Sequence, residues 1–416
     1  MLRFAYNLAW HAALPLLPLR LWWRARKEPR YLEHVGERFG RYAGRVEQPL
    51  IWIHAVSLGE TRAAQPLVHA LRERYPNDKL LFTHMTATGR AAAETLYGND
   101  LRAFLPYDYP WAVRRFIAHF RPRLGILMET ELWPNLVREC RHSGVPVLLA
   151  NARLSDKSAR GYARIAPLAR EALGDLAAIA AQTGPDAKRL AALGAHGVEV
   201  TGNLKFDLAP QPESLERGRA LRALAGARPV FLAASTREGE ELLLLDALAR
   251  APLRGALTVI VPRHPQRFDE VAALLRERGA AFVRRSEVRP VPADCSILLG
   301  DSMGELTAYY AAADVAFIGG SLLPYGAQNL IEACAVGAPV LIGPSTFNFA
   351  QAAAEAVAAG AAIQVADADA VVREAARLLA DAAARARMGA AGRSFCAAHR
   401  GATERTMAIV ARLLQR

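Results

Sequence analysis

Short apolar runs alternate with amphipathic stretches through most of this 416-residue chain, and the alternation occurs twice. A strand that is buried on both faces is a continuous apolar run, and such strands alternating with helical patterns indicate a parallel sheet covered by helices on both sides. Residues 208–228, which contain Pro210 and Pro212, interrupt the rhythm. We therefore predict two doubly wound α/β domains, which suits a chain of this length.

The apolar runs give the expected elements of each half. The predicted strands of the first half are Leu50–Val56, Leu80–His84, Leu124–Met128, Val145–Ala150, Ala177–Ala181 and Val198–Thr201. Those of the second half are Pro229–Ala234, Leu257–Pro262, Ile297–Gly300, Val315–Gly319 and Pro339–Ile342. Helical patterns include Arg62–Arg74 and Trp111–Phe120, and residues 383–416 are expected to form one or two helices. The predicted division is a membrane-associated segment at 1–30, a first domain at 31–207, and a second domain with the closing helices at 208–416.

The first 30 residues combine an apolar run with a basic border. Residues 4–19 carry no formal charge. A basic cluster follows, formed by Arg20, Arg24, Arg26, Lys27 and Arg30. Sixteen helical residues span about 24 Å, less than the roughly 30 Å of a bilayer's hydrocarbon core, and a basic cluster after the run argues against a cleaved signal peptide. Three interpretations stay open: a short membrane anchor, an interfacial helix with its tryptophans at headgroup depth, or a helix packed on the protein itself.

The positive charge is concentrated in the first half of the chain, and this limits the kinds of molecule that the chain is expected to bind. The net charge is +12, and residues 1–207 hold 29 Lys and Arg against 19 Asp and Glu. A basic first half fits an anionic membrane surface, an anionic substrate or a nucleic acid. Nucleic acid is the weakest of these, because zinc-finger spacing, a basic zipper and an aromatic RNP pattern are all missing from the sequence. Walker A, GxSxG and HExxH motifs are also missing, as is a GxGxxG after a strand, which argues against the usual kinases, hydrolases and NAD enzymes.

Charged residues follow predicted strands of the first half. Glu60 lies in HAVSLGET at the start of a helix, where the helix dipole should keep its carboxylate ionised, as a general base requires. A helix-terminal charge without a catalytic role is the alternative. Glu129 and Glu131 in METELWPN either support catalysis or simply open a helix. Lys205, in TGNLKFD at the end of this half, either faces an anionic donor or is solvated.

Strand ends and glycine turns of the second half are candidates for nucleotide contacts. Arg263 in PRHP follows a strand, and GDSMGEL opens a helix whose free backbone N–H groups can bind phosphate. Asn329 and Glu332 share a helix face, where a carboxylate suits ribose hydroxyls. Ordinary turn chemistry is the alternative for each glycine-rich turn. Because residues 290–372 contain no Lys or Arg, phosphate charge would be met mainly by helix termini and Arg263.

Seven segments occur together in an order that points to one family: HAVSLGE, METELWPN, NARLSDKSARGY, TGNLKFD, PRHP, GDSMGEL and NLIEACAVGAPVLIGPSTFNF. The chain closely resembles the bacterial 3-deoxy-D-manno-octulosonic acid (Kdo) transferase family over essentially its whole length. The resemblance implies an inverting GT-B glycosyltransferase with two Rossmann-like domains, the acceptor domain first and the nucleotide-sugar domain second, and a cleft between them. It also implies CMP-Kdo as donor, a lipid A precursor (lipid IVA) of lipopolysaccharide core biosynthesis as acceptor, and the cytoplasmic face of the inner membrane as location.

The resemblance also assigns roles to residues. Glu60 would be the catalytic base, and Glu129 and Lys205 would support the transition state. The CMP contacts would be Pro262, Arg263, Met303, Gly304, Glu305, Asn329, Leu330, Ile331 and Glu332. Gln328 stands where the family's Gly-His-Asn-Pro-Leu-Glu motif has histidine, which puts the role of that side chain in doubt.

Two further expectations concern cofactors and competing functions. A metal or other cofactor is not expected, since no Asp-x-Asp motif or histidine cluster is placed to bind a metal ion. The alternatives to a Kdo transferase are a GT-B enzyme that uses another nucleotide sugar and a catalytically silent protein that binds the membrane surface.

Overall fold

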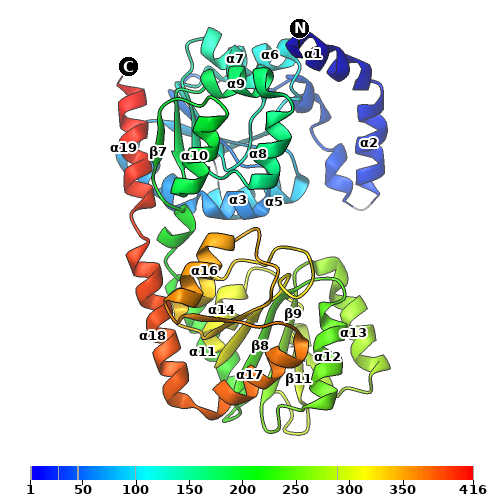
Figure 1. The fold of residues 1–416 in the computed structure, drawn as a ribbon. Coiled ribbons are helices and arrows are strands. Elements are labelled where there is room, and N and C mark those ends of the chain that lie inside the picture. The colour runs from blue at the N-terminus through cyan, green and yellow to red at the C-terminus, as the bar shows by residue number, and fades with distance from the viewer. Residues whose placement is uncertain (1, 27, 45, 99, 288, 416) are drawn as a thin grey trace. The chain divides into compact units, whose positions relative to one another are not determined.

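The computed structural model describes residues 2–26, 28–44, 46–98, 100–287 and 289–415. Lys27 of the basic cluster lies outside the described residues. The chain forms two compact units (Figure 1). Unit 1 is Met1–Leu208 with Arg400–Arg416, and unit 2 is Ala209–His399.

A parallel sheet forms the centre of unit 1. In the described part of this unit it has seven strands, in the order β3-β2-β1-β4-β5-β6-β7. The strands are β1 (Leu50–His54), β2 (Lys79–His84), β3 (Leu101–Phe104), β4 (Leu124–Met128), β5 (Val147–Ala152), β6 (Ala178–Ala181) and β7 (Val198–Val200). The strand order reverses between β1 and β4, which makes this a doubly wound sheet with its switch point there.

Helices cover both faces of this sheet because alternate side chains of each buried strand point to opposite sides. Trp52 packs in the core beneath α6, α7, α9 and α10, whereas Ile53 packs in the core beneath α4, α5 and α19. The α-helices of unit 1 are α1 (Leu2–Ala13), α2 (Leu16–Ala25), α3 (Leu58–Ala63), α4 (Gln65–Arg74), α5 (Ala87–Tyr97), α6 (Pro110–Phe120), α7 (Pro134–His142), α8 (Asp156–Ala163), α9 (Ala166–Gly174), α10 (Gly184–Ala192) and α19 (Ala402–Leu414). Its 3-10 helices are η1 (Pro29–Leu32), η2 (Val35–Phe39) and η3 (Leu204–Asp207).

Unit 2 repeats the same plan. Its described residues form a seven-stranded parallel sheet in the order β10-β11-β9-β8-β12-β13-β14, with the reversal between β8 and β12. The strands are β8 (Val230–Thr236), β9 (Leu257–Pro262), β10 (Phe282–Arg284), β11 (Ile297–Leu299), β12 (Val315–Ile318), β13 (Val340–Ile342) and β14 (Ala362–Gln364). The helices are α11 (Pro212–Ala225), α12 (Glu240–Arg250), α13 (Phe268–Glu277), α14 (Leu306–Ala312), α15 (Ile331–Val336), α16 (Ala350–Ala358), α17 (Ala368–Ala380) and α18 (Ala382–Ala398), with η4 (Pro265–Arg267) and η5 (Arg285–Glu287).

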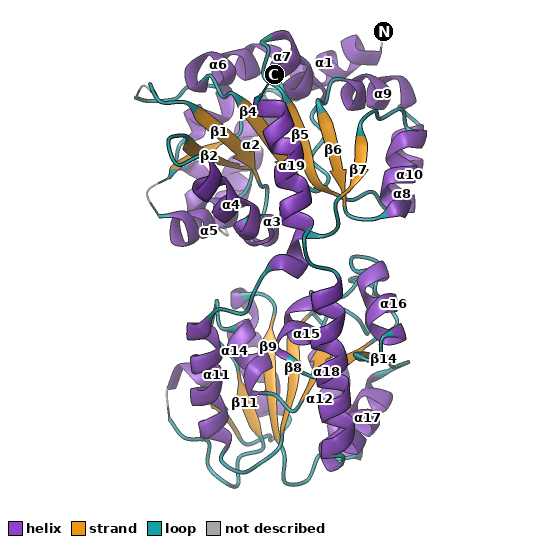
Figure 2. Cartoon of the chain, turned by 90° about the vertical axis from the view of Figure 1, so that its left-hand side faces the viewer, coloured by secondary structure: helices purple, strands orange, loops and turns teal. Residues whose placement is uncertain are grey.

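The sequence-based division placed both closing helices in the second domain, but only the first of them, α18, belongs to unit 2. Helix α19 is part of unit 1 (Figure 2), and its Ile409, Val410 and Leu413 are buried in the unit 1 core. The carboxylate of Asp207 accepts hydrogen bonds from the N atoms of Gly401 and Thr403, at 2.8 and 2.6 Å, at the start of this helix. The chain therefore leaves unit 1 after Leu208 and returns to it at Arg400.

The N-terminal segment forms two helices that pack on unit 1. The side chains of Leu17 and Leu21 are buried, and the Trp10 ring lies 5.5 Å from the Tyr109 ring. Tyr6 donates a 2.8 Å hydrogen bond to the buried carboxylate of Asp108. Among the helices that the structure describes, none has the length and apolar character needed to cross a membrane.

Candidate active site

Two of the predicted acidic residues lie at the switch point of the unit 1 sheet. β1 and β4 are neighbours, with His54 paired to Leu127, and Glu60 and Glu129 follow these two strands. Ligands of doubly wound proteins bind beyond the carboxyl ends of the strands at such a point. The sheet topology thus places both carboxylates at the edge where a substrate is expected.

Local hydrogen bonds fix Glu60 in the first turn of α3. Ser57 is the N-cap, and its Oγ accepts a 3.4 Å hydrogen bond from the Glu60 N atom. In return, the Glu60 carboxylate accepts hydrogen bonds from the Val56 N atom at 2.8 Å and from Ser57 Oγ at 3.0 Å. This reciprocal arrangement is a variant of the capping box, in which the carboxylate reaches the N atom of Val56 instead of that of the N-cap Ser57, and it explains why SLGE starts a helix here and why the carboxylate has one orientation.

The ionisation of Glu60 differs from the sequence-based expectation. Burial and the nearby Glu129 charge, with a further contribution from Glu131, raise the pKa of Glu60 to about 7 despite its hydrogen bonds to Val56 and Ser57. The prediction that the helix dipole keeps Glu60 ionised at neutral pH is therefore met only in part, because a pKa of about 7 leaves both the protonated and the ionised form present. Helix α3 has only six residues, so its dipole is outweighed by desolvation and like charge. A carboxylate with a pKa near the working pH is well matched to accept and release a proton.

Glu129 and Lys205 form an ion pair. Lys205 Nζ lies 2.8 Å from Glu129 Oε1, and the two side chains are only 16% and 13% exposed. Burial raises the pKa of Glu129, but Lys205 and the charge of Arg153 more than offset this, and the net pKa is below its usual value. Glu129 is thus a stable anion, whereas Glu60 is poised to exchange a proton.

The backbone around this ion pair takes conformations that only the surrounding structure can hold. Glu129 and Asn151 have φ angles of 59° and 53°, in the left-handed region, which is uncommon for residues other than glycine. Asn151 sits at a register shift of β5, and its buried Oδ1 accepts a 3.0 Å hydrogen bond from the Leu204 N atom. Asn151 orients the segment that carries Lys205, a role that its place in NARLSDKSARGY does not indicate.

The Glu131 carboxylate is held by a hydrogen bond, and it acts on the site through its charge. Its Oε2 accepts a 2.8 Å hydrogen bond from Trp133 Nε1, and burial raises its pKa. A cavity of about 240 Å³ lies beside the neighbouring Glu129, and Arg153 and Tyr162 also contribute to its lining. Of the charged residues at this site, Glu129 and Arg153 thus line an open volume.

The predicted nucleotide residues of unit 2 also meet at strand ends. Arg263 follows β9, and its Nε donates a 3.1 Å hydrogen bond to Gln328 Oε1. Asn329 Nδ2 donates to Glu332 Oε1 at 3.0 Å, and Asn329 Oδ1 accepts from the Ile331 N atom at 3.1 Å. Gln328, at the position where the resemblance leads one to expect a histidine, therefore joins Arg263 to the segment that holds Glu332.

The other predicted contacts differ in what they can offer a ligand. Met303 is 50% exposed, Gly304 has a φ angle of 80°, and Glu305 Oε1 accepts a 3.2 Å hydrogen bond from Arg285. Pro262 is the last residue of β9. The side chains of Leu330 and Ile331 are buried in the core, so only their backbone could contact a ligand.

A second cation follows the unit 2 switch point and was not predicted. Arg237 comes directly after β8, which has a register shift at Ser235, where φ is 55°. The buried carboxylate of Glu240 accepts hydrogen bonds from the N atoms of Arg237, Gly320 and Leu322 at 2.8, 2.6 and 2.9 Å, and so ties this loop to the one after β12. The position of Arg237 after a predicted strand was the one signal in the sequence that could have identified it.

No cluster of three or more His, Cys, Asp or Glu side chains suited to a metal ion occurs in the described parts of the chain.

Comparison with solved structures gives the fold. A glycosyltransferase from Rickettsia africae matches at a TM-score of 0.61 and 13% identity, covering 89% of this chain and 100% of that one. HepE from Anabaena, solved with UDP and glucose, matches at a TM-score of 0.58 and 13% identity over 88% of this chain and 99% of that one. Together with the two parallel sheets, these matches show a GT-B-like glycosyltransferase fold.

Comparison with known sequences gives the family. Residues 33–208 match the family model described as 3-Deoxy-D-manno-octulosonic-acid transferase (kdotransferase), and residues 280–395 match glycosyl transferases group 1. The 3-deoxy-D-manno-octulosonic acid transferase of Bordetella pertussis is 48% identical, covering 97% of this chain and 98% of that protein. That of Haemophilus influenzae is 38% identical over the full length of both. The chain belongs to the 3-deoxy-D-manno-octulosonic acid transferase family and is a glycosyltransferase.

Proposed function

We propose that this enzyme transfers Kdo from CMP-Kdo to the lipid A precursor lipid IVA, with inversion at the anomeric carbon and with Glu60 as the general base. The observation that carries the proposal is the state of Glu60 in a chain of the Kdo transferase family. Its carboxylate has one fixed orientation and a pKa of about 7, and it lies in the electrostatic field of Glu129 at the sheet's switch point.

The proposed reaction needs one proton acceptor and a group that stabilises the departing phosphate. A hydroxyl oxygen of the acceptor attacks the anomeric carbon of Kdo while its proton passes to Glu60. The bond between that carbon and the CMP oxygen breaks, and CMP leaves with the electron pair. Glu129 holds the ammonium group of Lys205 beside the reacting atoms, where a positive charge lowers the energy of the developing anion.

The donor is assigned to unit 2 on the chemistry of its strand ends. Arg263 offers a guanidinium for the monophosphate, and Glu332 accepts hydrogen bonds from ribose hydroxyls. Backbone N–H groups around Gly304 supply further donors, as the scarcity of cations in residues 290–372 requires. Gln328 positions Arg263 in place of a histidine.

The acceptor and the location are proposed from the character of the N-terminal helices. Exposed apolar side chains are concentrated on α1 and α2, namely Leu2, Phe4, Leu8, Leu16, Leu19, Trp22 and Trp23. Arginines border them, a combination that suits an anionic lipid surface. We place the enzyme at the cytoplasmic face of the inner membrane, where a phosphorylated lipid acceptor would be presented.

The experiment that tests this function is mass analysis of the lipid product. Purified full-length protein is incubated with lipid IVA and with CMP-Kdo generated in situ. We expect product masses that correspond to added Kdo, and inhibition by CMP but not by UDP or GDP. Inhibition by UDP or GDP would favour a GT-B enzyme with another nucleotide sugar. Binding of lipid without turnover would favour the catalytically silent protein.

A further inference from the structure

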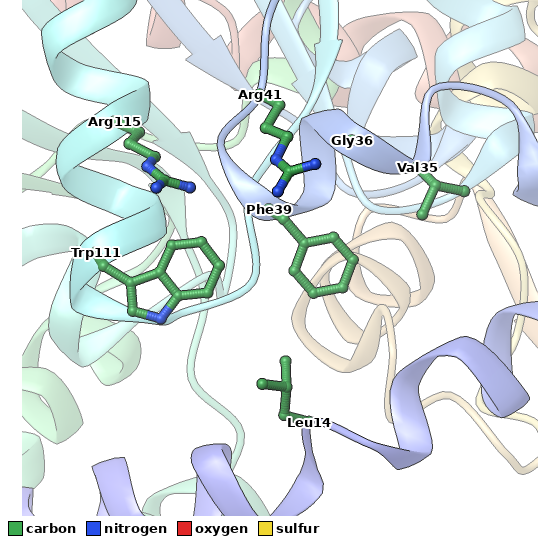
Figure 3. Close-up of a pocket in the computed structure, with 7 residues that line it drawn as sticks. All are labelled: Leu14, Val35, Gly36, Phe39, Arg41, Trp111 and Arg115. Carbon is green, nitrogen blue, oxygen red and sulfur yellow. The ribbon is translucent and has the colours of Figure 1, made fainter.

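Unit 1 also contains a cavity of about 390 Å³ that none of the residues assigned above to catalysis lines (Figure 3). Its volume falls in the range of roughly 300–1,000 Å³ that is usual for small-molecule sites. Figure 3 shows two guanidinium groups on one side of the cavity and an aliphatic side chain on the other, with aromatic rings between them. The lining residues are Leu14, Val35, Gly36, Phe39, Arg41, Trp111 and Arg115.

Close backbone packing brings the two arginines to this cavity. Gly40 follows η2 as its C-cap with a φ angle of 70°, and a Cβ atom at this position would lie only 2.6 Å from the Ala112 carbonyl oxygen of α6. The Arg41 N atom then donates a 3.0 Å hydrogen bond to the Gly36 carbonyl oxygen. Only glycine allows this approach, and it places Arg41 over the same cavity as Arg115 of α6.

The charges of these arginines are not neutralised by neighbouring carboxylates. Within the described ranges, neither the Arg41 nor the Arg115 guanidinium has an ion pair or a side-chain hydrogen bond, and the latter lies 5.1 Å above the Trp111 ring. Arg114, the adjacent residue of α6, instead pairs with Glu139 at 3.2 Å. Two exposed cations at the mouth of an apolar cavity can therefore bind an anion from solution.

The apolar part of the cavity is continuous with the exposed apolar surface of the N-terminal helices. Leu14 lies at the junction between α1 and α2, and α2 carries the large apolar side chains of Leu16 and Leu19, each 61% exposed. A small inorganic anion would make no contact with the aliphatic and aromatic side chains of the cavity. A neutral hydrocarbon would leave the two arginines without an anion. The combination fits a molecule with phosphate joined to hydrocarbon.

We propose that this cavity binds the phosphate-bearing end of an anionic lipid. Arg41 and Arg115 bind the phosphate, and Leu14, Phe39 and Trp111 contact the first part of the hydrocarbon. Such a group occurs in the acceptor lipid, an assignment that rests on the proposed function, and equally in a phospholipid of the bilayer. The shared chemistry is the inference, and the source is decided by experiment.

The first test measures binding to the full-length protein without turnover. Dodecyl phosphate, kept below its micelle-forming concentration, is titrated in a calorimeter against the wild type, an Arg41→Gln/Arg115→Gln variant and an Arg114→Gln control. We expect the double variant to bind about tenfold more weakly or worse, because two charge-assisted contacts are lost, and the control to bind normally. Both changes are at exposed side chains, so the fold should persist, which circular dichroism checks. Unchanged affinity in the double variant would overturn the proposal.

Two further ligands and one further variant show whether both halves of the cavity are used. Inorganic phosphate and dodecyl maltoside should each bind far more weakly than dodecyl phosphate, because each satisfies one half. Val35→Trp, which fills the cavity while keeping both arginines, should also weaken binding. Equal binding of inorganic phosphate and dodecyl phosphate would show a simple anion site and contradict the inference.

The second test identifies the source of the lipid. The transfer reaction is measured in phospholipid-free detergent. If the cavity binds the acceptor, the KM for lipid IVA should be about tenfold higher in the double variant, with kcat unchanged. A phospholipid-filled cavity predicts an unchanged KM there and weaker sedimentation with vesicles of phosphatidylglycerol. Either result supports a lipid site. A protein that binds dodecyl phosphate but transfers nothing would contradict the proposed function and leave this cavity assignment standing.

Discussion

Lys205 Nζ lies 2.8 Å from Glu129 Oε1, so two segments that are 76 residues apart in the chain meet at one ion pair. This contact separates the tasks of the acidic residues. Glu129 is bound to a cation and stays ionised, whereas Glu60 has no ion pair in the described structure and has a pKa of about 7. The proposed roles of Glu60 as base and of Glu129 as the support for Lys205 rest on this difference.

Replacing Glu60 by Gln should remove turnover and leave nucleotide binding intact. The substitution keeps the size and the acceptor oxygen of the capping box but removes the proton acceptor. General-base removal typically costs about 10²–10⁴-fold in rate. Transfer is measured by mass analysis and CMP binding by calorimetry, with the exposed Glu94→Gln on α5 as the matched control. If the variant retained more than about a tenth of wild-type turnover, another residue would be the general base, and Glu129 and Glu131 would be tested next by the same substitution.

The pH dependence of kcat/KM should report the ionisation of Glu60. Burial and Glu129 raise its pKa to about 7, and the base must be deprotonated to act, so activity should rise with pH through about 7. Because the Glu131 charge also raises this pKa, Glu131→Gln should shift the rise to lower pH. A pH profile that is identical in the Glu131→Gln variant would contradict the electrostatic contribution of this residue.

The same pKa makes a prediction about stability. The pKa of Glu60 is about 7 in the folded protein against 4.5 for the ordinary group, so the folded state binds the proton more tightly. Its contribution to the free energy of unfolding is present below pH 4.5 and is lost as pH rises through about 7. Glu60→Gln should therefore be more stable than the wild type at pH 8, and this difference should shrink at pH 4.5. Urea unfolding at the two pH values measures it, and an equal difference at both would contradict the pKa.

The ion pair of Glu129 and Lys205 should behave as a coupled unit. Lys205→Met leaves a largely buried carboxylate without its nearest cation, which should lower the free energy of unfolding by about 1–3 kcal/mol. Glu129→Gln combined with Lys205→Met should cost less than the sum of the single changes. Because the pKa of Glu129 is depressed, the pair contributes stability above the ordinary carboxyl pKa, and this is lost as pH falls through the folded value. Lys188→Met, at an exposed position of α10, is the control, and additive costs in urea unfolding would show that the residues are independent.

Nucleotide binding should depend on Arg263 and Glu332. Each Ala substitution removes a charge-assisted contact, which should weaken CMP binding by about 1.5–3 kcal/mol. Calorimetry compares them with Arg254→Ala and Glu277→Ala, which change the same charges at exposed positions of unit 2. Wild-type CMP affinity in both site variants would reject the assignment.

Membrane binding should depend on the outward face of α2. Leu19→Glu combined with Trp23→Glu places charges on side chains that are each 61% exposed, so folding should survive while insertion into a bilayer is lost. Sedimentation with membranes at low and high salt tests this, with Leu242→Glu/Leu243→Glu on α12 as the control. Deletion of residues 1–24 is a harsher test, because it also removes Leu17 and Leu21 from the core and the Tyr6 contact to Asp108. Unchanged sedimentation of both altered proteins would exclude a role for this segment.

Most of the strands that the sequence predicted are buried along their whole length, and the exception is the largely exposed edge strand β7, predicted as Val198–Thr201. Leu124–Met128 and Leu257–Pro262 were predicted with the bounds that the structure has, because every residue in them is buried. The missed strands β3, β10 and β14 are all edge strands. Each is short and has a polar residue, such as Arg102 or Arg284, within it, so it lacks a continuous apolar run. The predicted Arg62–Arg74 helix is in fact two helices that meet at Ala64, with Pro66 in the first turn of the second.

The candidate site could be located but not characterised from sequence. Strand ends pointed to Glu60 and Glu129 in unit 1 and to Arg263 in unit 2, since the parallel strands of each sheet bring such positions to one edge of that sheet. The pKa of Glu60 depends on burial and on carboxylates about 70 residues away, and neither has a local signal. The role of Asn151 depends on a hydrogen bond to Leu204, across 53 residues, and a left-handed backbone that no spacing indicates.

The return of the chain into unit 1 has a consequence for synthesis on the ribosome. The side chains of Ile409, Val410 and Leu413 complete the core of unit 1. The carboxylate of Asp207 has its hydrogen bonds only once Gly401 and Thr403 have been synthesised. Unit 2 is a continuous stretch and has all its residues by His399. The nascent chain can therefore finish its second unit before its first, and a protein halted before α19 would carry a finished unit 2 beside a unit 1 with an open apolar face, a natural target for chaperones.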